Sequence, residues 1–97
     1  MNNYTLADLN SRYVWYRTEQ GLTAILREGQ QLLEPRFVHN VMQQIAPHVF
    51  HVFWDRLNED VVQAHMNPSE VTKLAEAGLQ ISTERFVRPQ IPKIREL

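Results

Sequence analysis

Histidine and carboxylate side chains at close spacing are the strongest candidates for chemistry in this sequence. His48, His51, Asp55 and Glu59 would lie within about 80° of one another on a helix. Zinc accepts this set of nitrogen and oxygen ligands. The spacing is not that of a His-Glu-x-x-His motif, however, and the large apolar residues fall on the opposite side of the same wheel. We therefore interpret these residues as a solvated helix face, and we predict no metal site and no cofactor.

The sequence lacks the usual nucleophiles of covalent catalysis. The 97 residues include no cysteine, and no serine stands in a Gly-x-Ser-x-Gly elbow. The three glycines are too far apart along the chain to form a loop that binds phosphate through backbone amides. The absence of cysteine also excludes disulfides and thiolate zinc sites. We predict no catalytic residue and a function that is not enzymatic.

The charge balance disfavours a dedicated nucleic-acid binder. Ten basic residues stand against eleven acidic ones, so the formal net charge is -1. One local pattern keeps an alternative open, because residues 68–88 resemble a helix-turn-helix in outline and are followed by a mildly basic end. The second helix of that motif would be short. In this alternative the chain is a small DNA-binding regulator, and its nucleic-acid contacts are Arg85, Arg88, Lys93 and Arg95.

The elements that would position these residues are predicted to be helices. No Asn-Gly or Asp-Gly pair separates alternating apolar runs, so hairpin signals are missing. A helix should begin at Thr5, where Thr5 and Asp8 form a capping-box pattern. Its apolar stripe is Leu6, Leu9, Tyr13 and Tyr16. A second set points to nearly the opposite side: Leu22, Ile25, Leu26, Leu32 and Leu33. Either 5–33 is one helix with two apolar faces, or it breaks near Gly21.

Prolines divide the remainder of the chain. A helix should start at Pro35, and a further helix should run from Pro47 to about His65. The latter has its apolar residues on one side: Phe50, Phe53, Trp54, Leu57, Val61 and Ala64. A short strand through 48–54 is the competing interpretation, because that segment is rich in β-forming residues. The segment Pro68–Ala77 is predicted as a helix that Asn67 caps and Gly78 ends. A short helix after Ser82 should stop before Pro89.

These elements predict an all-α domain, a small bundle of four to five helices. Residues 1–97 form the single domain, with a helical core over 1–88 and an extended, proline-containing tail over 89–97. No stretch reaches about 18 apolar residues, and the first residues do not have the pattern of a signal peptide. We expect no membrane contact and a cytoplasmic location.

The apolar residues occupy more faces than a short bundle needs, and this surplus indicates a protein partner. We predict a small regulator or inhibitor that forms a homodimer, occupies a surface of a larger protein, or does both. No family resemblance supports the assignment, and whether the chain inhibits, adapts or stabilises its partner stays open. The predicted partner-binding or dimer residues are Leu6, Leu9, Tyr13, Tyr16, Trp15, Ile91, Ile94 and Leu97.

Overall fold

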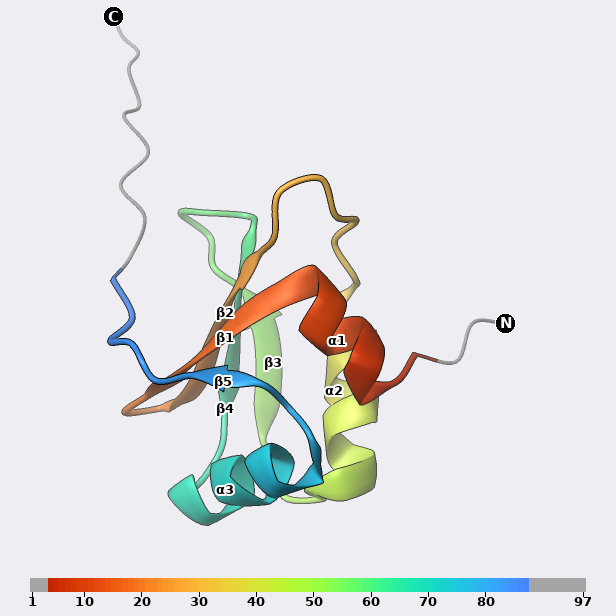
Figure 1. Cartoon of the computed structure of the whole chain (residues 1–97), viewed down its shortest axis with the longest axis vertical. Coiled ribbons are helices and arrows are strands. Elements are labelled where there is room, and N and C mark those ends of the chain that lie inside the picture. Colours follow the sequence, from red (N-terminus) through yellow and green to blue (C-terminus); the bar gives the residue numbers. More distant parts are fainter. Residues whose placement is uncertain (1–3, 88–97) are drawn as a thin grey trace, which may run out of the picture.

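The chain has an α/β fold, which corrects the predicted all-α bundle. The computed structural model describes residues 4–87, and within them it has three helices and a five-stranded mixed sheet (Figure 1). The elements follow in the order α1 (Leu6–Arg12), β1 (Tyr13–Thr18), β2 (Gly21–Leu26), α2 (Pro35–Ile45), β3 (His51–Trp54), β4 (Val61–His65), α3 (Pro68–Ala77) and β5 (Ile81–Ser82).

All three helices start where the sequence predicted a helix start. At α1 the Asp8 backbone N–H donates to Thr5 Oγ1 at 3.4 Å, and the Thr5 N–H donates to a carboxylate oxygen of Asp8 at 2.7 Å. This is the reciprocal pairing of a capping box. Helices α2 and α3 begin at Pro35 and Pro68, where the missing proline N–H costs no helical hydrogen bond. Gly78 ends α3 with a φ of 123°.

The first predicted helix is wrong beyond Arg12. Residues 5–33 form neither one long helix nor two, but the short helix α1 followed by the hairpin of β1 and β2. Strand β1 consists mainly of aromatic and β-branched residues, which favour a pleated strand over a helix. Glu19 and Gln20 connect the two strands, and Gly21 takes a φ of 139° directly after them. Positive φ is accessible to glycine at little cost, so this turn needs no Asn-Gly pair.

The predicted helix from Pro47 to His65 is also absent. Strands β3 and β4 occupy that stretch and pair with each other in antiparallel register. Of the two alternatives, the strand through 48–54 was the nearer one, but β3 covers only His51–Trp54. The strand was rejected because the sequence showed no partner for it. The partner is β4, which lies within the stretch predicted as the same helix.

The strands lie in the order β3-β4-β2-β1-β5, and only the β1–β5 pair is parallel. Cross-strand partners share a face of the sheet. Trp15, Ala24 and Val62 form one such row, are fully buried, and pack with core residues of all three helices. Figure 1 shows α1 and α2 on one side of the sheet and α3 below its lower end, and no helix covers the opposite side. We call this opposite side the helix-free face.

The segment after α3 differs from the prediction as well. Ile81–Ser82 forms the short edge strand β5, and residues 83–87 contain no helix. The second helix of the helix-turn-helix outline is therefore missing. Arg88 and the predicted tail over 89–97 lie outside the described residues. Among residues 4–87, no helix is long and apolar enough to cross a membrane.

Candidate functional site: the free edge of the sheet

Most of the predicted partner-binding residues that the structure describes belong to the core. Leu9, Tyr13 and Trp15 have no exposed surface, and Leu6 is half-buried against the same cluster. Tyr16 lies on the helix-free face, where its ring contacts Phe86 at a centroid distance of 5.4 Å. Ile91, Ile94 and Leu97 lie outside the described residues. The predicted stripe is thus divided between a helix and a strand and does not form one surface.

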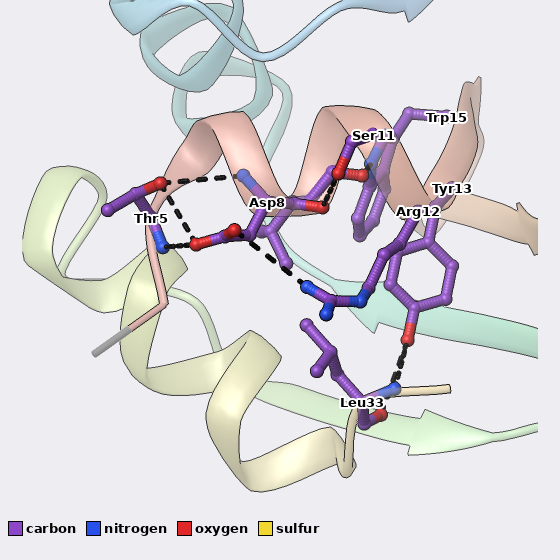
Figure 2. Close-up of polar contacts among 8 residues, drawn as sticks. Thr5, Asp8, Ser11, Arg12, Tyr13, Trp15 and Leu33 are labelled. Carbon is purple, nitrogen blue, oxygen red and sulfur yellow. Dashed lines mark hydrogen bonds and ion pairs between the residues drawn. The ribbon is translucent and has the colours of Figure 1, made fainter. Parts of the chain in front are cut away.

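Tyr13 shows what these buried residues do. Its hydroxyl accepts from the Leu33 N–H at 2.8 Å and donates to the Leu33 carbonyl at 3.3 Å (Figure 2). Burial raises the pKa of Tyr13 above its ordinary value of 10.0, and the Leu33 hydrogen bond and the Arg12 charge oppose the increase. Arg12 itself pairs with Asp8 at 3.8 Å. The Tyr13–Leu33 hydrogen bonds join β1 to the loop that precedes α2, so the role of Tyr13 is structural.

Arg85 is the one residue of the predicted nucleic-acid set within residues 4–87. It borders a shallow hollow of about 470 Å³ together with Arg17, Thr18, Glu19 and Phe86. The acidic Glu19 offsets part of the positive charge there. Arg88, Lys93 and Arg95 lie outside the described residues.

The most exposed apolar surface lies instead at the edge strand β3. Four large hydrophobic side chains are exposed within residues 4–87, and three of them stand in β3 or close beside it. Phe50 is 64% exposed, Trp54 37% and Leu57 82%. The fourth is Val87, which lies beyond the opposite edge strand. Their spacing predicted that Phe50, Trp54 and Leu57 share the apolar side of a helix, and the β-forming composition of 48–54 was the signal for a strand.

Strand β3 has backbone groups available for a further strand. It pairs only with β4 in the described sheet. The Asp55 N–H donates to the Val61 carbonyl at 2.8 Å, so the backbone of Asp55 points toward β4. Backbone direction alternates along an antiparallel strand. The N–H and C=O groups of Val52 and Trp54 therefore point away from the sheet.

A hollow of about 280 Å³ adjoins this edge on the helix side. Pro35, Arg36, His39 and Asn40 of α2 line it, opposite Phe50, His51 and Val52. The Nδ1 atom of His39 is buried and has no hydrogen-bond partner among the described residues. A side chain from a strand added beside β3 would enter this hollow from the edge.

The helix-free side of the same edge carries a cluster of rings. Phe53 lies 5.0 Å from the ring of His51 and 5.2 Å from that of His65. Asp55 follows directly after β3, where its carboxylate accepts from the Leu57 N–H at 2.7 Å and from Gln63 Nε2 at 3.2 Å. Apolar and aromatic groups thus follow one another along β3, and an acidic group comes directly after it.

The helical ligand set considered for a metal does not form. His51 stands on β3, and His48, Asp55 and Glu59 lie on connections rather than on one helix face. Across residues 4–87, no three histidine or acidic side chains are placed to hold a metal ion.

Comparisons with known protein families, with curated proteins and with solved structures found no match to this chain.

Proposed function

We propose that this chain is a protein–protein interaction module that binds a partner strand along the free edge of β3. The observation that carries the proposal is the concentration of exposed apolar side chains at this one edge. Strand addition obtains affinity from backbone hydrogen bonds and specificity from alternate side chains that enter neighbouring hollows. Val52 and Trp54 offer the backbone groups, and the hollow beside α2 offers the side-chain site.

The composition of β3 supports the same conclusion. Natural proteins usually protect an edge strand with lysine, proline, a bulge or very short length, because a bare edge pairs with other chains. The other edge strand, β5, has only two residues. The four residues of β3 are His-Val-Phe-Trp and include neither lysine nor proline. An unprotected edge of this kind is expected where pairing is the function.

Strand addition also accounts for how a small chain would act as a regulator or inhibitor. A partner paired with β3 becomes part of a rigid sheet, and the surface of that partner around the pairing strand is covered. No catalytic group is needed for such an effect.

The test uses the full chain as bait in extracts of its native host, together with a second, differently tagged copy. The Phe50→Lys, Leu57→Lys double variant places charges at both ends of the edge, and Val87→Lys is the matched control at a distant exposed position. The wild type and the control should retain the same proteins, and the double variant should lose them. Equal retention by the double variant, or no protein retained by the wild type, would refute the proposal.

A further inference from the structure

We propose that the strand added at β3 is the β3 strand of a second copy of this chain. The two strands would run antiparallel about a two-fold axis through Phe53, and the two sheets would join into one. This inference rests on the proposed interaction function and identifies the partner. A two-fold contact requires a surface that is complementary to itself, and β3 meets this requirement in its backbone and on both faces.

The backbone groups favour the register centred on Phe53. The outward groups belong to Val52 and Trp54, as the Asp55–Val61 hydrogen bond establishes. A two-fold axis perpendicular to the sheet places each face of one copy beside the same face of the second copy. A residue whose side chain lies on one face can therefore stand opposite only a residue whose side chain lies on that face. Val52 opposite Trp54 of the second copy uses every outward N–H and C=O of both residues. Centring on Val52 instead would require the Phe50 N–H, which already donates to the His65 carbonyl at 3.0 Å.

The helix side of this register matches a large side chain to a hollow. Val52 lines the hollow between β3 and α2, and Trp54 of the second copy would stand opposite Val52 and enter it. Trp54 is 37% exposed although it belongs to the same row as the buried Trp15. A tryptophan N–H usually has a hydrogen-bond partner when it is buried. His39 borders the hollow, and its Nδ1 atom is buried without a hydrogen-bond partner among the described residues.

The helix-free side is complementary in the same register. Phe53 stands opposite Phe53 of the second copy as a non-hydrogen-bonded pair. In antiparallel strands the side chains of such a pair come closest together. His51 stands opposite Asp55 of the second copy, so an imidazole lies beside a carboxylate on each side of the axis. Aromatic pairs stabilise neighbouring strands, and an imidazole N–H can donate to a carboxylate oxygen.

A cysteine at the axis tests both the dimer and its register. The chain has no native cysteine, so Phe53→Cys introduces a single thiol. In the proposed register the two Cα atoms at position 53 are about 4.5 Å apart, which permits a disulfide. His51→Cys is the matched control on the same face of the same strand. Its thiols would be about 13 Å apart, because residue 51 opposes residue 55.

Phe53→Cys should therefore oxidise to a covalent dimer on a non-reducing gel, and His51→Cys should remain a monomer on the same gel. Light scattering of the wild type should give twice the chain mass of 11.4 kDa. Trp54→Lys should give the mass of one chain, and Val87→Lys should keep the mass of two. This comparison tests the dimer even if Phe53→Cys does not fold. A monomeric wild type, or cross-linking of His51→Cys as fast as Phe53→Cys, overturns the inference. Edge-dependent retention of a different protein by a monomeric wild type would refute the dimer and leave the proposed function intact.

Discussion

At the scale of single residues, Tyr13 shows how a correct observation leads to a wrong role. The sequence marked it as part of an apolar stripe, and it does turn inward. Its partners are the backbone groups of Leu33, twenty positions later in the chain. Spacing identifies which residues avoid water, but it does not identify what they contact, because that depends on the tertiary arrangement. Short-range features, such as the pairing of Thr5 with Asp8 and the end of α3 at Gly78, were readable residue by residue.

Replacing Tyr13 with phenylalanine should cost about 1–3 kcal/mol in the free energy of unfolding, because the Leu33 N–H loses its buried acceptor. The substitution should also change the pH dependence. The raised pKa of Tyr13 means that the folded chain holds this proton more tightly than the unfolded chain does. This contribution is complete below about pH 10 and is lost as the pH rises through the folded pKa.

Urea unfolding at a series of alkaline pH values measures both effects. The wild type should lose stability above about pH 10 more steeply than Tyr13→Phe does. Tyr16→Phe, on the opposite face of the same strand, is the control and should keep the wild-type slope. Identical slopes for Tyr13→Phe and the wild type would show that this phenol is not held in its protonated form by the fold.

At the scale of elements, local signals predicted the helices and failed for the strands. Thr5, Pro35 and Pro68 act within one helical turn, so their effects are visible in a short window of sequence. Spacings of three and four residues also occurred by chance across 13–26 and 51–65, where they imitated helices. The aromatic and β-branched content of these segments was the better signal. The strand β3, and with it the candidate site, was present only as the rejected alternative.

The hairpin of β1 and β2 depends on Gly21, near which one of the two interpretations of 5–33 placed a helix break. A Cβ atom at this position would collide with the Ala64 carbonyl oxygen on β4 and lie 2.8 Å from the Met66 nitrogen. Gly21→Ala should therefore be destabilising by about 2–5 kcal/mol, from positive-φ strain and overpacking together. Gly29→Ala is the control, since its φ is also positive but nothing lies within 4 Å. Thermal unfolding of the two variants compares them, and equal losses would contradict a role for close packing at Gly21.

At the scale of the whole molecule, the order of the strands in the sheet could not be predicted from the sequence. Strand β2 pairs with β1 on one side and with β4 on the other, although α2 and β3 intervene along the chain. Such pairings depend on registers between distant segments, and no local window contains them. The position of β3 at the edge follows from this order. The exposure of Phe50, Trp54 and Leu57 could therefore not be foreseen from their hydrophobicity.

The proposed dimer makes thermal stability depend on protein concentration, because association removes folded monomer from the unfolding equilibrium. The wild-type Tm should rise when the chain is concentrated about a hundredfold, and the Tm of Trp54→Lys should stay constant. Val87→Lys should follow the wild type. Scanning calorimetry over this range provides the measurement. A wild-type Tm that is independent of concentration would contradict association at the β3 edge.

The parallel pairing of β5 with β1 has a consequence for the order in which the sheet is completed. Trp15 is paired with Ile81, near the other end of the described chain, so this contact closes one of the longest loops in the fold. Long loops close late and slowly, and a two-residue strand contributes little to keep them closed. During synthesis the outer edge of β1 stays open until residue 82 has left the ribosome. In the finished molecule the amide hydrogens of β5 should exchange with solvent before those of the central strands.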